Sequence, residues 1–206
     1  DPQPAAILSF LHDSALAHAP TQWIWRCHID LTDANPAVWE FFRPFVEQHG
    51  ASVWTMPEFV PASLKMDRVV HAPPCIDPLS VKNLDLPMPF CVEITKQYGI
   101  DPHRPIMCQV SRYDPWKDPV GVIDAYRIVK SADPSVQLLL AGAQADDDPQ
   151  GAHYLDLARA HAAGDPDVRL LTDADGVGDV EVNAFQRAAT VAIQKCVLIR
   201  RTEYIS

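Results

Sequence analysis

The sequence predicts an α/β fold made of two incomplete Rossmann-like halves, each built on a parallel sheet. Short apolar segments of strand length alternate with amphipathic segments of helix length, which is typical of parallel strands joined by helical crossovers. A proline-rich stretch at residues 72–78 interrupts this alternation and marks a boundary, because proline disfavours regular structure. The 206 residues, 48% of them hydrophobic, are enough for one large domain or two small ones.

The first half is expected to contain three strands, at residues 23–28, 52–55 and 69–71. Three helices are expected around them, at residues 5–12, 36–48 and 57–64. One of these helices starts at Asn35 and Pro36 and runs through Gln48, and Gly50 follows as the kind of residue that commonly closes helices. Its core face is predicted to consist of Val38, Phe41, Phe42, Phe45 and Val46.

The second half is expected to contain four strands, at residues 106–110, 136–142, 168–171 and 190–193. Its helices are predicted at residues 90–98, 119–130, 153–162 and 179–188. Asp118 is the expected N-cap of the second of these helices, and Pro119 its first residue. The core face of that helix is predicted to be Val122, Ile123, Tyr126 and Val129.

The loop between strand 106–110 and the helix that starts at Pro119 carries two cations, Arg112 and Lys117. In an open α/β sheet, ligands bind at the carboxyl ends of the strands. A helix N-terminus and two cations favour an anion there, and phosphate suits them best. The alternative is that Arg112 and Lys117 only form surface ion pairs with Asp114 and Asp118.

Composition excludes several classes of partner. The net charge is −10, from 27 acidic and 17 basic residues, and no run of Lys or Arg occurs, so we expect no nucleic-acid partner. The longest apolar runs are too short to span a bilayer, and no secretory signal pattern is present, so we expect no membrane association. The five cysteines are scattered without metal-ligand spacing, which favours a reducing, cytoplasmic location.

The octapeptide at residues 111–118, Ser-Arg-Tyr-Asp-Pro-Trp-Lys-Asp, resembles the donor-phosphate loop of retaining GT-B glycosyltransferases, and in particular of the trehalose synthase (trehalose glycosyltransferring synthase) type. Four other segments resemble that family in the same order, at residues 1–4, 25–30, 73–80 and 189–195. The resemblance ends near Lys195, before the family's Glu-Gly-Phe-Gly loop. We therefore interpret the chain as a glycosyltransferase fragment, truncated at both ends.

This resemblance implies the transfer of glucose, with retention, from a nucleotide-sugar donor such as ADP- or UDP-glucose to a sugar acceptor, glucose, to give trehalose. Arg112 and Lys117 would be the catalytic residues, because they stabilise negative charge on the leaving diphosphate. The donor site would also include Ser111 and Gly142, where glycine permits a close backbone approach at a strand end. No cofactor and no metal would be required.

The resemblance also assigns the remaining segments. Acceptor-side candidates are Asp1, Gln3, His28 and Asp30. For His28 a hydrogen-bonded core histidine is an equally good interpretation. The expected domains are the end of the acceptor-side domain at 1–76, a linker and hinge at 77–104, the start of the donor domain at 105–195, and a non-family tail at 196–206.

Three functional hypotheses stay open for this chain: an active glycosyltransferase, an inactive fragment that binds nucleotide or phosphate, and a non-enzymatic interaction module. The last strand, at 190–193, carries no charge or proline to protect a sheet edge. We therefore expect a homo-oligomer or an aggregation-prone chain.

Overall fold

The computed structural model describes residues 3–11, 22–143 and 149–194. The chain divides into two compact units, Asp1–Ile76 and Asp77–Ser206. Both units are α/β, and every strand pair in them is parallel. The predicted fold class, two Rossmann-like halves with parallel sheets, is therefore confirmed.

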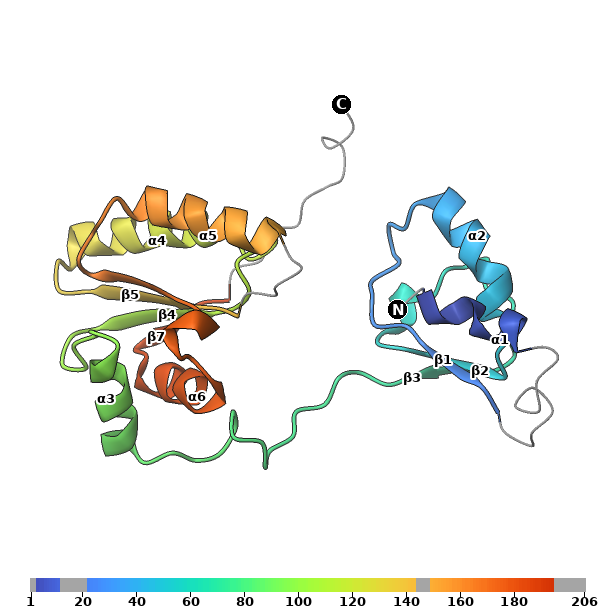
Figure 1. Ribbon diagram of the computed structural model, residues 1–206, viewed down its shortest axis with the longest axis horizontal. Helices are drawn as coiled ribbons and strands as arrows, with labels where there is room; N and C mark the ends of the chain where they lie inside the picture. The colour runs from blue at the N-terminus through green and yellow to red at the C-terminus, as the bar shows by residue number, and fades with distance from the viewer. Residues whose placement is uncertain (1–2, 12–21, 144–148, 195–206) are drawn as a thin grey trace. The chain divides into compact units, whose positions relative to one another are not determined.

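The first unit is a three-stranded sheet with the order β1-β2-β3. Its strands are β1 (Ile24–Arg26), β2 (Ala51–Trp54) and β3 (Val69–His71). Its helices are η1 (Gln3–Ala6), α1 (Ile7–Phe10), α2 (Pro36–Val46) and η2 (Pro57–Phe59). In Figure 1, α1 and α2 lie over the same face of this sheet. Trp25 and Trp54 from the sheet and Trp39 from α2 form the centre of an aromatic core.

Helix α2 starts as predicted, with the Asn35 side chain accepting hydrogen bonds from the amides of Ala37 and Val38. Its predicted core face is wrong at two positions, because Val38 and Phe41 are 52% and 64% exposed. Trp39 is buried instead, with its ring centroid 6.4 Å from that of Trp54. Apolar residues occupy most of this helix, so periodicity alone does not define the buried face.

The predicted helix over 57–64 is also shorter in the structure, where η2 ends at Phe59. Val60 has extended backbone angles, φ −80° and ψ 114°. Because Val60 precedes Pro61, the helical conformation is disfavoured at this position. The proline therefore ends the helix after one turn.

The second unit is a four-stranded sheet with the order β6-β5-β4-β7. Its strands are β4 (Ile106–Val110), β5 (Gln137–Ala141), β6 (Val168–Leu171) and β7 (Val191–Ala192). Its helices are α3 (Met88–Gln97), α4 (Pro119–Ala132), α5 (Pro149–Ala162), η3 (Asp173–Asp175) and α6 (Asp179–Ala188). Figure 1 shows α4 and α5 on one face of the sheet and α3 and α6 on the other. Both faces of β4 are therefore covered.

Helix α4 buries Val122, Ile123 and Tyr126 as predicted, but Val129 is 41% exposed. The next residue on the inward face of the helix, four positions after Tyr126, is Lys130. Its ammonium lies 2.8 Å from the Asp165 carboxylate. The predicted core position at Val129 is therefore wrong, because an ion pair replaces the apolar contact at the last turn of the helix.

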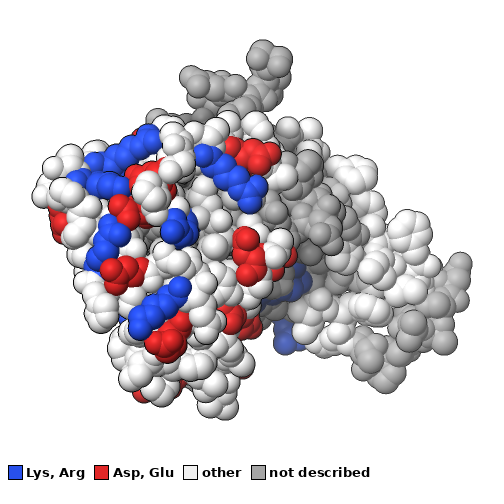
Figure 2. Space-filling view, turned by 60° about the vertical axis from the view of Figure 1, so that its left-hand side comes forward, with Lys and Arg blue, Asp and Glu red and all other residues white. Residues whose placement is uncertain are grey.

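The described surface mixes charges of both signs. On the face shown in Figure 2, basic and acidic side chains are interspersed, and neither kind gathers into a large patch. Within the described ranges, no helix has the length and apolar character that a bilayer crossing requires.

Candidate functional site

The loop of residues 111–118 joins the carboxyl end of β4 to the start of α4, where the sequence predicts ligand binding. Gln109, a buried residue of β4, links the two ends of this loop by hydrogen bonds. Its Nε2 donates hydrogen bonds to the Ser111 hydroxyl and to the backbone carbonyl of Lys117, both at 3.0 Å. A single amide side chain thus fixes the separation of the loop's ends.

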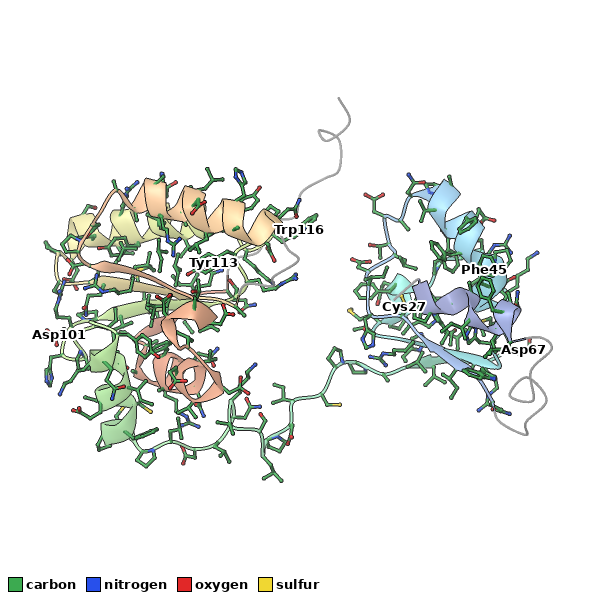
Figure 3. All side chains as sticks on the ribbon, viewed as in Figure 1. Cys27, Phe45, Asp67, Asp101, Tyr113 and Trp116 are labelled. Atoms are coloured by element: carbon green, nitrogen blue, oxygen red, sulfur yellow. The ribbon has the colours of Figure 1, made fainter. Side chains whose placement is uncertain are left out.

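Tyr113 anchors the middle of the loop to the neighbouring strands. Its hydroxyl lies 3.0 Å from the carbonyl oxygens of Leu140 and Leu171, in β5 and β6. Burial raises the pKa of the Tyr113 phenol far above its usual value, so the proton is retained for donation. Figure 3 shows Tyr113 in the interior, whereas Trp116 lies at the surface, where it is 47% exposed.

Gly142, predicted to allow a close approach at the end of β5, meets the loop itself. A Cβ atom on Gly142 would stand 2.1 Å from the carbonyl oxygen of Ser111 and 3.2 Å from the Tyr113 ring. The Ser111 amide also donates to the carbonyl of Ala141 at 2.9 Å. The close backbone approach thus exists, and in this structure it is made by the 111–118 loop.

The two predicted cations have different surroundings. The Arg112 side chain is 70% exposed, and its Nη2 lies 3.4 Å from Oδ2 of Asp114. Among the described residues, no carboxylate lies within ion-pair distance of the Lys117 ammonium. The interpretation of both cations as mere surface ion pairs therefore applies to Arg112 but not to Lys117.

The start of α4 has fewer free donors than expected. Asp118 is the N-cap, as predicted, and its Oδ1 accepts the Gly121 amide at 3.0 Å. Its backbone is left-handed, with φ 45° and ψ 61°, a conformation that aspartate tolerates better than most residues. Because Pro119 has no N–H, an anion here would depend mainly on the two side-chain cations.

The acceptor-side candidates lie in the first unit, apart in sequence from the loop. His28 is exposed, so the alternative of a core histidine is wrong. Asp30 is also exposed, and its Oδ1 accepts from the amide and hydroxyl of Thr32 at 2.8 and 2.7 Å. Asp1 and the side chain of Gln3 lie outside the described residues.

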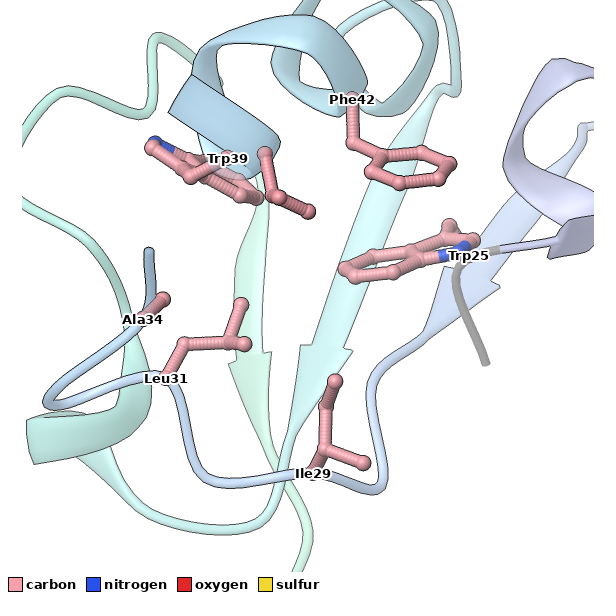
Figure 4. A pocket seen from close by; sticks show the side chains of 7 residues that line it. Trp25, Ile29, Leu31, Ala34, Trp39 and Phe42 are labelled. Atoms are coloured by element: carbon pink, nitrogen blue, oxygen red, sulfur yellow. The ribbon is translucent and has the colours of Figure 1, made fainter. Parts of the chain in front are cut away.

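The first unit also contains an apolar pocket that the sequence did not predict. It has a volume of about 80 Å³ and lies between the end of β1, the loop that follows and α2 (Figure 4). Its lining residues are all apolar: Trp25, Ile29, Leu31, Ala34, Val38, Trp39 and Phe42. Without polar groups the pocket does not suit a sugar, whose hydroxyls need hydrogen-bond partners.

The described residues contain no cluster of three or more His, Cys, Asp or Glu side chains placed to hold a metal ion. The expectation of a metal-free reaction stays a prediction.

Comparisons with known proteins identify close relatives. Residues 1–61 match the family model described as the N-terminal domain of trehalose synthase. The trehalose synthase of Rubrobacter xylanophilus is 46% identical over 197 residues, which are 96% of this chain and 47% of that protein. The trehalose synthase of Thermococcus litoralis is 45% identical over 194 residues, which are 94% of this chain and 46% of that protein. The chain thus spans about half the length of these relatives.

Solved structures agree with the fold. Anabaena HepE, in complex with UDP and glucose, superimposes with a TM-score of 0.69 at 14% identity, over 95% of this chain and 51% of that one. The apo structure of OtsA superimposes with a TM-score of 0.59 at 14% identity, over 92% of this chain and 50% of that one. At such identities these structures support the GT-B fold alone. The sequence identity to trehalose synthases extends over nearly the whole chain but over less than half of each of these relatives, so the chain is similar to part of a trehalose synthase.

Proposed function

We propose that the loop of residues 111–118 binds the diphosphate of a nucleotide-glucose donor, ADP- or UDP-glucose. The observation that carries this proposal is the pair of cations Arg112 and Lys117 on one loop. Hydrogen bonds from Gln109 and Tyr113 attach this loop to the sheet. The site lies at the carboxyl end of β4, the usual place for ligands in such sheets. HepE, which shares the fold, was solved with UDP and glucose, and this supports a nucleotide-sugar ligand.

The reaction proposed for the whole protein is glucosyl transfer to glucose with retention, giving trehalose. As the bond between glucose and the diphosphate breaks, negative charge develops on the leaving phosphate oxygens. Arg112 can donate two parallel hydrogen bonds to them, and Lys117 supplies a compact positive charge. Both would stabilise the transition state more than the ground state. We propose that no metal is needed, because two cations neutralise the leaving group.

The acceptor side of the proposed reaction lies in the first unit. His28 and Asp30 are exposed at the loop that follows β1, and both have polar atoms suited to sugar hydroxyls. Asp1 and Gln3 are proposed as further acceptor contacts on the family resemblance alone. The four described cysteines, Cys27, Cys75, Cys91 and Cys108, are free thiols, which supports the proposal of a cytoplasmic location.

Titration calorimetry with ADP and UDP tests the donor loop. Lys117→Ala should weaken binding by about 1–3 kcal/mol, the usual contribution of a charge-assisted contact. Lys96→Ala is the matched control, because Lys96 is an exposed lysine of the same unit that pairs with Glu93 in α3. Equal affinities for the wild type and Lys117→Ala would overturn the donor-loop assignment.

A second function is favoured by the chain's coverage of its relatives, about half their length. We propose that the 206-residue chain binds nucleotide diphosphate but transfers glucose only at a very low rate, because donor positioning supplies much of the rate acceleration. A glucosyl-transfer assay separates the two proposals. Trehalose formation well above a Lys117→Ala control would favour the active enzyme, and absence of nucleotide binding would favour an interaction module.

A further inference from the structure

The loop of residues 111–118 carries as many negative as positive charges. Arg112 and Lys117 are balanced in formal charge by Asp114 and Asp118. The Asp118 carboxylate is engaged as the helix cap of α4. Asp114 differs, because its side chain is only 7% exposed and it lies inside the loop, where it adds negative charge to a site that must attract an anion.

The two carboxylate oxygens of Asp114 have different roles. Oδ1 accepts the backbone amide of Lys117 at 2.9 Å, and this bond reinforces the turn that the same amide makes with the Asp114 carbonyl at 3.2 Å, ahead of the Lys117 side chain. Oδ2 is buried and has no hydrogen-bond donor among the described residues. The nearest cation is Nη2 of Arg112, at 3.4 Å, which is ion-pair distance without a hydrogen bond.

This arrangement leaves Arg112 between two anions when a phosphate binds. A buried carboxylate oxygen without a hydrogen bond attracts any donor within reach. The Arg112 side chain is mostly exposed, so it is held loosely and can turn toward solvent. A phosphate at the loop would therefore have to draw the guanidinium away from Asp114.

We propose that Asp114 is a positioning residue and the internal counter-charge of the phosphate site. This inference rests on the function proposed above. Through Oδ1, Asp114 shapes the turn that presents Lys117, and through Oδ2 it competes with phosphate for Arg112. The competition weakens the binding of the nucleoside diphosphate product, which carries one more negative charge than the nucleotide sugar once the glycosidic phosphate ester is broken. The consequence is easier product release.

Variants at Asp114 separate its two roles. Asp114→Asn removes the charge and keeps an oxygen that accepts the Lys117 amide. It should bind ADP or UDP about three- to tenfold more tightly at low ionic strength, and the gain should shrink in about 0.5 M salt. Asp114→Ala removes both the charge and the side-chain acceptor, so the Lys117 turn keeps only its 3.2 Å backbone hydrogen bond and loosens. Its affinity should fall below that of Asp114→Asn.

Controls address folding and net charge. Asp114→Ser is a second neutral variant, because its hydroxyl can accept the same amide hydrogen bond, and it serves if Asp114→Asn does not fold. Thermal unfolding shows which variants are folded. Glu93→Gln makes the same change in net charge on α3, at a side chain that is 67% exposed, and should leave affinity unchanged.

The outcomes distinguish the two proposals. If Lys117→Ala weakens nucleotide binding but both neutral Asp114 variants bind no more tightly than the wild type, the counter-charge role is wrong and the donor loop stands. If the wild type binds no nucleotide, or binds it independently of Lys117, the donor loop is wrong and the role of Asp114 falls with it. Tighter, salt-sensitive binding by Asp114→Asn or Asp114→Ser supports both.

Discussion

The carbonyl oxygen of Ser111 occupies the space in which a side chain on Gly142 would have to stand. A Cβ atom at Gly142 would lie 2.1 Å from that oxygen, far inside van der Waals contact. Hydrogen bonds fix the backbone of both residues: the Ser111 amide donates to the carbonyl of Ala141, and the Gly142 amide donates to the carbonyl of Leu171. Neither can move without disturbing the ends of three adjacent strands.

Gly142→Ala should therefore destabilise the second unit and disturb the loop at once. We expect a loss of about 1–3 kcal/mol in the free energy of unfolding, typical of overpacking, together with weaker nucleotide binding. Urea unfolding and calorimetry measure the two effects. Gly50→Ala is the control, because its Cβ would meet only ordinary contacts, the nearest at 3.6 Å. Unchanged stability in Gly142→Ala would show that the loop backbone moves freely.

The buried thiol of Cys108 should make the protein less stable at alkaline pH. Burial raises the pKa of its thiol from 9.0 to about 12. Below pH 9 the folded and unfolded chains both keep this proton. Between pH 9 and 12 only the folded chain keeps it, so the unfolding free energy falls by up to ~1.4 kcal/mol per pH unit.

Cys108→Ala should remove that part of the slope, whatever stability it loses from the smaller side chain. Urea unfolding at several pH values from 8 to about 10.5 measures it. Cys75→Ala serves as the control, because Cys75 is exposed and should leave the slope unchanged. The raised pKa of Tyr113 acts in the same direction and is common to all three proteins. Parallel slopes for the wild type and Cys108→Ala would contradict the prediction.

The features that local sequence predicts best are those with local causes. Strand β4 has its predicted bounds, because a short apolar run between polar loops has few other conformations. Asp118 and Pro119 start α4 as predicted, since the cap and the first helical residue act on their own backbone. The order β6-β5-β4-β7, which places the fourth strand beside the first, also follows from the doubly wound pattern.

The parts that fix the candidate site were not predictable in this way. Tyr113 bonds to the carbonyl of Leu171, 58 residues away, and Gln109 reaches across the loop to Lys117. No periodicity or motif records such distant partners. The position of Arg112 and Lys117 between strand and helix, together with the family resemblance, identified the two cations, but neither showed that Asp114 lies buried beside Arg112.

The edge of the second sheet predicts self-association. Strand β7 pairs with β4 on one side, and among the described strands it has no neighbour on the other. Val191 is 52% exposed there, and neither residue of β7 is charged. An unprotected edge can pair with a second chain. We expect the wild type to associate at micromolar concentrations and Val191→Lys to shift it toward monomer.

Sedimentation velocity at several concentrations measures this association. Ile128→Lys is the control, because Ile128 is 72% exposed on helix α4 rather than at a strand edge, and it should leave association unchanged. A wild type that stays monomeric at every concentration would show that the edge is covered.

The last prediction concerns the segment of residues 81–85, which α6 holds by side-chain bonds. Asn183 is buried, and its Nδ2 donates to the carbonyls of Val81 and Leu84, both at 2.8 Å. Arg187 adds bonds to the Asn183 amide oxygen at 2.8 Å and to Leu84 at 3.0 Å. The segment has no helix or strand of its own, so these bonds fix its course along the second unit.

Asn183→Ala should free the segment, because the Val81 carbonyl loses the Asn183 donor, the Leu84 carbonyl keeps only Arg187, and Arg187 loses the acceptor that orients it. We expect a loss of about 1–3 kcal/mol in the free energy of unfolding and faster proteolytic cleavage within 81–85. Asp85→Ala is the matched control, since it removes an ion pair with Arg187. The Asp85 side chain is 95% exposed, and ion pairs of such exposed groups contribute little to stability. Limited proteolysis followed by mass spectrometry locates the cuts. Equal cleavage rates in the two variants would mean that Asn183 does not anchor the segment.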